Sequence, residues 1–372
     1  MAEKFSLKDH LFNERTVAQL AGEYAAALPF FHADRFQAEA LSGFGSRELL
    51  ARLDWMADCL EAQLATDFPT MADQLTAAMQ PPLDPNLQDD DFGQFIHALP
   101  GILAVRHGLE DHRDRALDLL YEATKRFSME FYIRPFLNRW QNQTLARMAA
   151  WAEDENYHVR RLVSEGTRPK LPWAKAVTLD TSHTLPLLDI LHADQTRYVT
   201  RSVANHLNDI TKTKPDLVVK TLQNWARAAQ QDDKELAWMT RHGLRTLIKQ
   251  GHGPALAHLG YRGDVDVSAR MTLSQEAYAI GDVLEFTSTL KAATALPVIV
   301  DYRIIFARPG GKTAEKVFKL KVGQIAKGKA LTLRKKHRLK GDATTFKLYP
   351  GAHQIILQVN GVDVAQAAFE LT

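Results

Sequence analysis

The sequence has almost no cysteine, because Cys59 is the only one among its 372 residues. A single cysteine excludes an internal disulfide and is typical of proteins from a reducing compartment. Cys59 lies in a helical pattern, LDWMADCLEAQL, where a buried small apolar side chain is more common than a nucleophile. No apolar run approaches the ~20 residues of a membrane span, and the N-terminus lacks an apolar signal core. These absences predict a cytoplasmic protein that does not enter a membrane.

The sequence also lacks a large charge of either sign and the short motifs of common cofactor sites. Its 46 Lys and Arg residues nearly balance 44 Asp and Glu residues, so the net charge of +2 does not identify a partner. No glycine-rich phosphate loop, His-Glu-x-x-His zinc motif or cysteine pair is present. The histidines are scattered, and His206 in SVANHLND is the one with the most interesting setting. The sequence therefore argues against a redox, zinc-dependent or nucleotide-driven enzyme, and we expect neither metal nor cofactor.

What is present, before about residue 264, is one helical pattern after another. The segment 81–95, PPLDPNLQDDDFGQF, is rich in proline and aspartate and predicts a loop that interrupts this region. No alternating strand pattern occurs before the end of the helical region.

The helical region contains an internal repeat that appears when the chain is shifted against itself by about 40 residues. Apolar residues share one register, Val159, Val199 and Met239. Arginines share another register, Arg161, Arg201 and Arg241. This period is typical of HEAT-type repeats, whose stacked helix pairs form a solenoid with a concave groove. We therefore predict a HEAT-like α-helical repeat domain over residues 1–263.

The pattern changes after Gly260 to short alternating runs separated by turn residues such as Pro309-Gly310-Gly311. About seven strands in the last part of the chain are typical of an immunoglobulin-like β-sandwich. The paired cysteines of antibody domains are missing, so the prediction depends on the pattern alone. The expected fold is mainly α, with a β-sandwich domain over residues 264–372.

Positive charge concentrates in the predicted sandwich. Between residues 301 and 340 there are thirteen Lys and Arg residues, among them Lys335 and Lys336, and only two acids, Asp301 and Glu315. Such a patch favours contact with a phosphate backbone. The alternative is a solvated face on edge strands, where lysine discourages aggregation.

The repeated arginines allow two interpretations as well. Equivalent positions in a solenoid line up along its surface, so a row of guanidiniums could contact successive phosphates. The alternative is ion pairing within and between repeats, for example between Arg161 and Glu165, which are four residues apart on one helix. The first interpretation predicts a DNA-binding groove and the second a purely structural row.

Four segments together resemble the bacterial DNA alkylation repair proteins of the AlkC/AlkD group, and the AlkC branch most closely. They are RFSMEFYIRPF, HVRRLVSEGTRPKLPW, SVANHLNDITKTKPDLV and RHGLRTLIKQG, and with their spacing they cover most of residues 90–260. Members of this group are HEAT-like-repeat DNA glycosylases, and some AlkC-type members carry an immunoglobulin-like extension. The C-terminal part of this chain is similar to that extension.

The resemblance implies an activity and a partner. The family hydrolyses the N-glycosidic bond of cationic alkylated bases, chiefly 3-methyladenine, and the AlkC branch is also associated with 3-methylcytosine. A base alkylated on a ring nitrogen is already a good leaving group, so the enzyme mainly has to stabilise an oxocarbenium-like sugar and place a water. The implied protein is a monomeric, metal-independent, monofunctional glycosylase that acts on double-stranded DNA and leaves an abasic site.

The resemblance also assigns residues. Arg160, Arg161 and Arg201 match the phosphate-clamping helices of the family. Glu122 is the first candidate for the catalytic carboxylate because it precedes the RFSMEFYIRPF motif, Asp154 is the second, and Trp173 would form an aromatic wall. Where the AlkD branch has a catalytic tryptophan, this chain has Asn205, which favours the AlkC branch. The predicted DNA contacts are completed by Arg168, Asn205, Arg241, Arg245, Lys335 and Lys336.

A non-catalytic alternative remains open. HEAT-type solenoids commonly serve as binding scaffolds, so the chain could be a module that binds branched or damaged DNA, or a protein partner, through the same concave face. Salt dependence separates these partners, since phosphate contacts weaken steeply with added salt.

Overall fold

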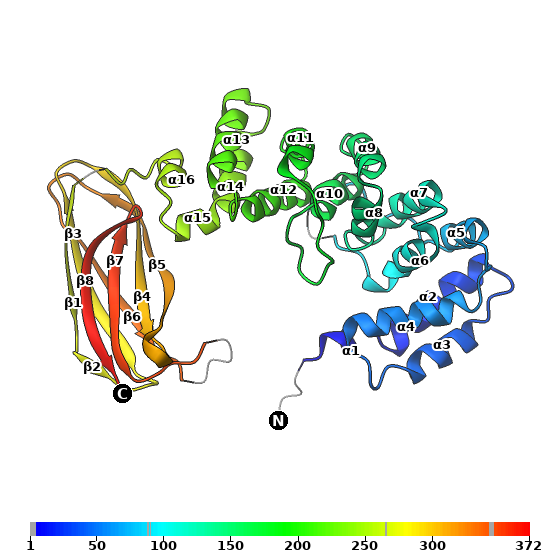
Figure 1. The fold of residues 1–372 in the computed structure, drawn as a ribbon, viewed down its shortest axis with the longest axis horizontal. Coiled ribbons are helices and arrows are strands. Elements are labelled where there is room, and N and C mark those ends of the chain that lie inside the picture. Colours follow the sequence, from blue (N-terminus) through cyan, green and yellow to red (C-terminus); the bar gives the residue numbers. More distant parts are fainter. Residues whose placement is uncertain (1–4, 88, 90, 265, 342–345) are drawn as a thin grey trace. The chain divides into compact units, whose positions relative to one another are not determined.

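Helices fill the described chain up to His258 and strands follow from Val267, as the change of sequence pattern predicts (Figure 1). The structure is a computed structural model that describes residues 5–87, 89, 91–264, 266–341 and 346–372. A helical region followed by β-sheets confirms the expected fold class. None of the helices in the described residues combines the length and the apolar character needed to cross a membrane.

The packing of the chain divides it into two compact units. Unit 1 consists of Met1–Ile210 and Trp225–Gly243, and unit 2 of Thr211–Asn224 and Leu244–Thr372. The division therefore differs from a single cut near residue 263, because two helical segments group with the strands. Each unit is described by itself below.

Unit 1 is built from short helices, several of which begin at a side-chain cap. Asn13 and Thr16 form a reciprocal capping box, and Asp67, Asn156 and Asp180 each accept a hydrogen bond from a backbone N–H in the first turn of the helix that follows. The helices are α1 (Leu7–Leu11), α2 (Glu14–Ala27), α3 (Ala33–Ser42), α4 (Leu49–Glu61), α5 (Phe68–Ala77), η1 (Phe95–Ala98), α6 (Leu99–Gly108), α7 (Arg113–Thr124), α8 (Ile133–Arg139), α9 (Gln141–Trp151), α10 (Tyr157–Gly166), α11 (Thr181–Leu191), α12 (Arg197–Ile210) and α14 (Asp233–Gly243).

Three helices of unit 1 form one row. α10 packs against α12, and α12 against α14, so that they lie side by side in Figure 1. Val159, Val199 and Met239, which share a register in the sequence, are fully buried in these helices. The apolar face predicted from the repeat is therefore the face on which this row packs.

In the part of the chain that the structure describes, unit 2 contains eight strands in two sheets and the helices α15 (Arg245–Lys249) and α16 (Gly253–His258). Helix α13 (Pro215–Ala228) is divided between the two units. The strand order is β1-β3-β6 in one sheet and β2-β8-β7-β4-β5 in the other. The strands are β1 (Val267–Leu273), β2 (Ala277–Tyr278), β3 (Val283–Ala292), β4 (Leu296–Ala307), β5 (Thr313–Ile325), β6 (Leu331–Arg338), β7 (Gly351–Val359) and β8 (Val362–Leu371).

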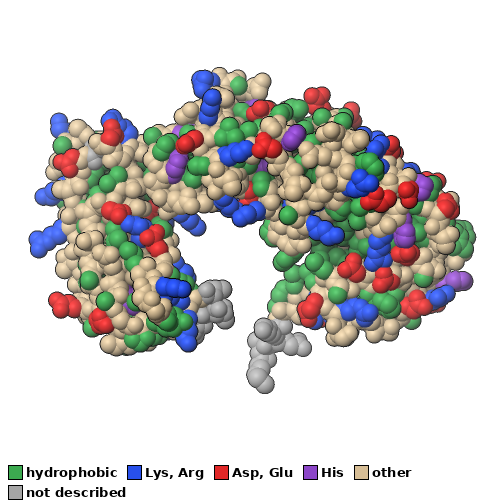
Figure 2. Space-filling view, viewed as in Figure 1, with side chains coloured by type: hydrophobic (Ala, Val, Ile, Leu, Met, Phe, Trp, Pro, Cys, Tyr) green, Lys and Arg blue, Asp and Glu red, His purple; other side chains and the backbone are tan. Residues whose placement is uncertain are grey.

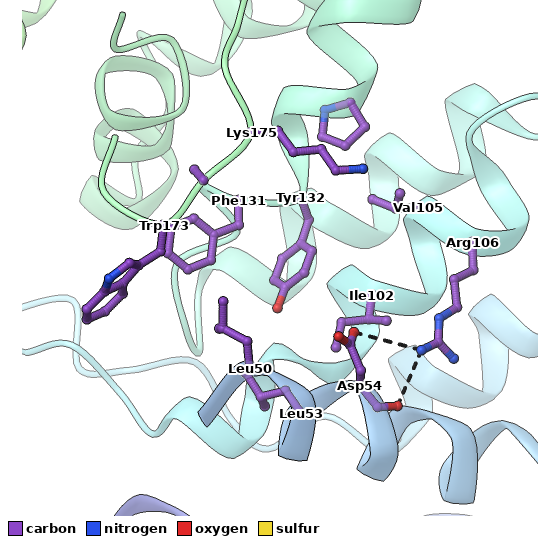
Figure 3. A pocket seen from close by; sticks show the side chains of 12 residues that line it. Leu50, Leu53, Asp54, Ile102, Val105, Arg106, Phe131, Tyr132, Trp173 and Lys175 are labelled. Carbon is purple, nitrogen blue, oxygen red and sulfur yellow. Dashed lines mark hydrogen bonds and ion pairs between the residues drawn. The ribbon is translucent and has the colours of Figure 1, made fainter. Parts of the chain in front are cut away.

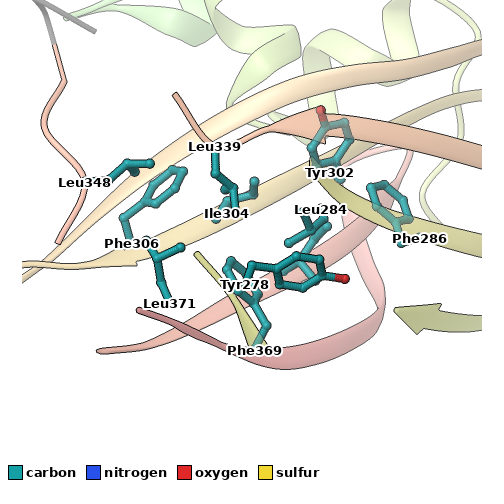
Figure 4. Close-up of a cluster of buried hydrophobic side chains, with 11 residues drawn as sticks. Tyr278, Leu284, Phe286, Tyr302, Ile304, Phe306, Leu339, Leu348, Phe369 and Leu371 are labelled. Atoms are coloured by element: carbon teal, nitrogen blue, oxygen red, sulfur yellow. The ribbon is translucent and has the colours of Figure 1, made fainter. Parts of the chain in front are cut away.

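The two sheets share an apolar core. Phe286 of one sheet and Tyr302 of the other make an edge-to-face contact, with ring centroids 5.2 Å apart, and Ile304, Phe306 and Phe369 belong to the same buried cluster (Figure 4). Burial alternates along β3 and β6, as the alternating sequence predicts. β5 and β6, which end their respective sheets, carry many of the basic residues of segment 301–340.

Candidate active site and nucleic-acid interface

The three arginines of the repeated register lie on the neighbouring helices α10, α12 and α14, and they differ in exposure. The side chain of Arg161 is 13% exposed and that of Arg201 is 31% exposed, whereas Arg241 is at the surface. The three arginines therefore share one register, but the exposure of their side chains increases along the row from Arg161 to Arg241.

Arg161 is the centre of a buried group of charges. Its Nη1 donates to Glu130 Oε2 at 2.8 Å and to Ser128 Oγ at 3.0 Å, and its Nη2 lies 3.8 Å from Glu165 Oε2. Glu130 belongs to the turn that precedes α8, and Glu165 lies one helical turn after Arg161 on α10. One guanidinium thus holds two carboxylates from two separate elements.

Glu165 links this pair to a second arginine. Its Oε1 accepts from Arg168 Nη1 at 2.5 Å, and its Oε2 accepts from Ser202 Oγ at 2.5 Å. Arg168 also lies 3.0 Å from Asp209 Oδ2 on α12. We call Glu130, Arg161, Glu165, Arg168 and Asp209 the arginine–carboxylate cluster.

The electrostatics of the cluster are set by burial and by its own charges. Burial acts to raise the pKa of the Glu165 carboxyl, but Arg161 and Arg168, with the hydrogen bond from Ser202, outweigh it and hold that pKa below its usual range. The neighbouring carboxylates of Glu130 and Glu165 raise the pKa of Arg161 further above its usual value, against the effect of burial. The ions of the cluster stabilise each other, so removal of one would leave its partners uncompensated.

Aromatic rings cover one side of the cluster. The guanidinium of Arg161 lies 4.5 Å from the centroid of the Tyr198 ring, and Tyr198 meets Phe92 edge-on at 5.4 Å. His158 lies 5.4 Å from Tyr198, and burial with the nearby Arg161 lowers the pKa of His158 to about 4, so this imidazole is neutral at neutral pH. The surroundings of Arg161 are therefore apolar and aromatic on one side and anionic on the other.

His206, the histidine singled out by the sequence, is a buried structural residue beside the cluster. Its Nδ1 donates to the backbone oxygen of Ser164 at 3.0 Å, and burial lowers its pKa to about 4. The neutral ring is therefore bonded through Nδ1 alone, because its Nε2 is buried without a hydrogen-bond partner among the described residues. Among the described residues, no group of three His, Cys, Asp or Glu side chains is arranged to hold a metal ion.

The two carboxylates nearest to Arg161 differ in what they could do. Both oxygens of Glu165 are occupied by hydrogen bonds, and its side chain is 6% exposed. Glu130 is 18% exposed and uses one oxygen, Oε2, for both Ser128 and Arg161. Glu130 therefore has a second oxygen that can act on a molecule at the surface, while Glu165 holds Arg161 in place.

The two predicted carboxylates, Glu122 and Asp154, are paired with groups other than Arg161. Glu122 pairs with Lys125 at 2.9 Å and with Arg126 at 3.2 Å at the end of α7, and these cations outweigh burial and lower the pKa of Glu122. Asp154 accepts from the Tyr121 hydroxyl at 2.8 Å and from the backbone N–H of Asn156 at 2.8 Å. The polar partners of Arg161 among the described residues are Ser128, Glu130 and Glu165, and the catalytic roles of Glu122 and Asp154 stay predictions.

Trp173 lies in the loop that follows α10. Its side chain is 72% exposed and its φ is +63°, in the left-handed region that large side chains rarely adopt. It lines a cavity together with Phe131 and Tyr132, the two residues after Glu130. Trp173, the predicted aromatic wall, therefore follows Arg168 of the cluster closely in the sequence, but its side chain lines a separate cavity.

The predicted DNA contacts fall into two classes. Arg160 is engaged, since it pairs with Asp194 at 2.5 Å, and Arg168 is engaged inside the cluster. Arg201 pairs with Asp89, and Asn205 Oδ1 accepts a hydrogen bond from His242 Nε2 at 2.9 Å. Arg241 of unit 1 is exposed, and so is Lys336 of unit 2, which lies 3.4 Å from Glu285. Arg245 and Lys335 of unit 2 are half-buried.

Basic side chains are most prominent on the strands. On the face shown in Figure 2, Lys and Arg side chains lie around the edge of the strand domain with several acidic side chains among them, and both signs also mix over the helices. Arg334, Lys336 and Arg338 alternate along β6 as exposed residues. Their positions fit contact with an extended anion, as the composition of this segment predicts.

Sequence reasoning missed the two carboxylates nearest to Arg161, Glu130 and Glu165, as candidates for chemistry. Glu130 stands inside the RFSMEFYIRPF motif, and Glu165 follows Arg161 by four residues in HVRRLVSEG. The spacing of Glu165 from Arg161 is visible in the sequence, where it supports the interpretation of the arginine row as ion-paired and structural. The sequence does not indicate that Glu130, among the acids near the motif, is the one that contacts Arg161 on α10.

Comparison with known proteins gives three findings. The family described as "DNA alkylation repair enzyme" matches residues 122–247, and the family described as the C-terminal Ig-like domain of the uncharacterised protein YhaZ matches residues 267–372. The uncharacterized protein YhaZ of Bacillus subtilis (strain 168) is 32% identical over 363 residues, which cover 94% of this chain and 95% of YhaZ.

The third finding is structural. The fold of this chain matches that of the Pseudomonas fluorescens alkylpurine DNA glycosylase AlkC bound to DNA containing an abasic site analog. The TM-score is 0.84 with 33% sequence identity, and the match covers 99% of this chain and 100% of AlkC. These similarities confirm the resemblance seen in the sequence and the immunoglobulin-like character of the strand region.

Proposed function

This chain belongs to the family of DNA alkylation repair enzymes related to AlkC and YhaZ, and from that premise we propose that it is a monofunctional DNA glycosylase. Its proposed substrates are cationic alkylated bases in double-stranded DNA, 3-methyladenine first and 3-methylcytosine second, and its product is an abasic site. The relative AlkC is an alkylpurine DNA glycosylase and was solved on DNA with an abasic site analog, which supports both the reaction and the partner.

The observation that carries the proposal is Glu130, held by Arg161 and Ser128 at one oxygen and partly exposed at the surface. In glycoside hydrolysis a carboxylate stabilises the oxocarbenium-like sugar that forms as the bond to the leaving group breaks. A cationic base takes both electrons of the glycosidic bond and leaves neutral, so it needs no protonation. Water then adds to the sugar carbon and gives up its proton, for which a carboxylate is a suitable acceptor.

The role of Arg161 in this proposal is to position Glu130, because its guanidinium is occupied by protein carboxylates. Phosphate contacts would come from the exposed cations of the row and of β6, Arg241 and Lys336 among them. The cluster then carries the chemistry, and the surface cations carry much of the affinity for DNA.

A set of matched variants tests which carboxylate acts. Glu130→Gln keeps the size of the side chain and an oxygen for Arg161, and it should lower the rate of base release roughly 10²–10³-fold, as loss of one electrostatic stabiliser does in other enzymes. Glu122→Gln and Asp154→Asn serve as controls with the same change of charge. The measurement is the release of 3-methyladenine and 3-methylcytosine from methylated duplex DNA, separated by chromatography and identified by mass.

Three results would decide between the candidates. Loss of activity in Glu130→Gln alone supports the proposed site. Loss in Glu122→Gln or Asp154→Asn, with Glu130→Gln as active as wild type, would return the catalytic role to the acids predicted from the resemblance. Tight binding of DNA without any base release by the wild-type protein would leave the non-catalytic binding module as the function.

A further inference from the structure

A cavity of about 270 Å³ lies in unit 1 next to the turn that carries Glu130. Its walls come from α4, α6, the turn before α8 and the loop after α10, as Figure 3 shows. Figure 2 shows hydrophobic side chains gathered in the hollow between α4 and α8. The volume is close to the lower end of small-molecule sites, which begin at about 300 Å³.

Three aromatic side chains line this cavity. Phe131 and Tyr132 come from the turn and Trp173 from the loop, and aliphatic side chains such as Leu50 and Ile102 add to the apolar wall. In Figure 3 the Tyr132 ring points into the cavity and Phe131 lies between Tyr132 and Trp173. Flat apolar walls of this kind bind flat aromatic ligands by stacking.

Polar groups stand at the edge of the same cavity. Arg106 is held by Asp58 at 2.6 Å, by Glu61 at 3.1 Å and by the backbone oxygen of Asp54 at 3.3 Å, which fixes its guanidinium beside the cavity. Burial and the nearby Asp54 raise the pKa of Tyr132, so its hydroxyl keeps its proton and can donate. Lys175 adds an ammonium group on the opposite wall (Figure 3).

The cavity is built into the fold. Gly101 leaves room for Tyr132, because a Cβ at this position would lie 2.2 Å from the Tyr132 ring. The loop of Trp173 is anchored by the buried Arg134, which donates to the backbone oxygens of Lys175 at 2.5 Å and of Arg168 at 2.9 Å. An anchored loop that exposes a tryptophan in a strained backbone conformation is typical of a functional surface.

We propose that this cavity receives an unstacked nucleobase of the bound DNA, next to the nucleotide that reacts at Glu130. The proposal rests on the proposed function for its partner. Its own support is the combination of aromatic walls for stacking, hydrogen-bonding groups and the ammonium of Lys175, which could contact the attached phosphate. Two of the aromatic residues, Phe131 and Tyr132, directly follow Glu130 in the sequence. The base comes either from the damaged strand beside the lesion or from the opposite strand.

Photocrosslinking locates the base and identifies its strand. Duplexes carry a stable abasic-site analogue, and 5-iodouracil replaces one thymine at a time, in separate duplexes for each position on either strand near the analogue. The full-length protein is bound, irradiated and digested, and crosslinked peptides are mapped by mass spectrometry. We expect one position to crosslink to the peptide with Phe131 and Tyr132 or to the peptide with Trp173.

A pocket-filling variant tests the same site without crosslinking. Leu50→Trp places a large ring in the cavity from a lining position that is 39% exposed on α4. Leu7→Trp makes the same change on α1, at a position that is 44% exposed and does not line the cavity. Leu50→Trp should weaken binding to the abasic duplex about tenfold, the loss of one base–aromatic stack, and Leu7→Trp should bind like wild type.

The outcomes separate this inference from the proposed function. Crosslinks that map only to other peptides, or equal affinities of the two tryptophan variants, overturn the inference even if the wild-type protein releases bases. A crosslink in the cavity without base release supports the inference and contradicts the proposed glycosylase. No binding of any duplex contradicts both.

Discussion

The sharpest prediction concerns Arg161, whose loss should affect stability before it affects DNA binding. Arg161→Ala removes the guanidinium that lies 2.8 Å from Glu130 and 3.8 Å from Glu165. Both carboxylates are largely buried, and Glu165 keeps only Arg168 as a charged partner, 2.5 Å away. The variant therefore leaves two largely buried carboxylates, Glu130 and Glu165, without the guanidinium that they share in the wild type.

The expected cost follows from that geometry. Breaking a buried ion pair by removal of one partner typically costs about 3–5 kcal/mol, because a buried charge is left uncompensated. For a unit of more than 200 residues, the melting temperature falls ~2–4 °C per kcal/mol, so the expected decrease is roughly 6–20 °C. Arg241→Ala is the matched control, since it removes the same side chain at the same register on α14, where it is exposed, and should change stability by less than about 0.5 kcal/mol.

The assay is thermal melting followed by far-ultraviolet circular dichroism, repeated at several pH values. In the wild type the pKa of Glu165 is held below its usual value of 4.5, so its pairing stabilises the fold above that pH and ceases to do so as the pH falls through the lowered pKa. Without Arg161 this pKa rises, and protonation relieves the uncompensated charge. The deficit of Arg161→Ala should therefore be large at pH 7 and smaller near pH 4.5.

Two results would refute this reasoning. One is a melting temperature of Arg161→Ala equal to that of Arg241→Ala at neutral pH. The other is a deficit that does not depend on pH, which would mean that packing of the side chain against Tyr198, and not charge, is what the substitution removes. If the single variant is too unstable to purify, Arg161→Ala with Glu165→Gln should recover part of the loss, because it removes one of the two carboxylates.

Three further predictions concern other parts of the chain. Burial raises the pKa of Asp301 to about 6, so the free energy of unfolding should decrease as the pH rises from about 4 to above 6. Asp301→Asn should abolish this decrease and, in denaturant titrations at pH 8, stabilise the protein by roughly 1–3 kcal/mol. Gly101→Ala should cost about 1–3 kcal/mol in unfolding free energy and reduce crosslinking in the cavity, since its methyl group meets the Tyr132 ring. Lys336→Ala, at an exposed position of β6, should reduce the slope of log affinity against log salt by about 0.9 without changing the preference among alkylated bases, and an unchanged slope would exclude a phosphate contact there.

The fold was predictable because its signals are local. The spacing of Val159, Leu162 and Val163 specifies a helix face within one turn or two, and the alternation along β3 or β6 specifies a strand within a few residues. The repeat of about 40 residues then placed α10, α12 and α14 in one row. The division into compact units was not visible in the same way, because the grouping of residues 211–224 with the strands depends on contacts far along the chain.

The site was only partly predictable because the partners of a charge are not local. The register identified Arg161, and the i,i+4 spacing offered Glu165, but Glu130 lies 31 residues before Arg161 and on another element. Glu122 and Asp154 were preferred for their nearness to motifs in the sequence. In the structure their oxygens are taken by Lys125, Arg126 and Tyr121.

The row of arginines shows why one register can serve two purposes. At α10 the side chain is surrounded by Glu130, Glu165 and Tyr198, so its charge is balanced inside the protein, whereas at α14 the same position is exposed. A balanced guanidinium attracts a phosphate only weakly, and an exposed one attracts it strongly at low salt. In the proposed function, substitutions in the arginine–carboxylate cluster should therefore lower kcat and stability, and substitutions of Arg241 or Lys336 should raise KM and flatten its salt dependence. A substitution at Arg241 that lowered kcat at saturating DNA would show that the row acts as a single catalytic surface and that chemistry and affinity are not separated along it.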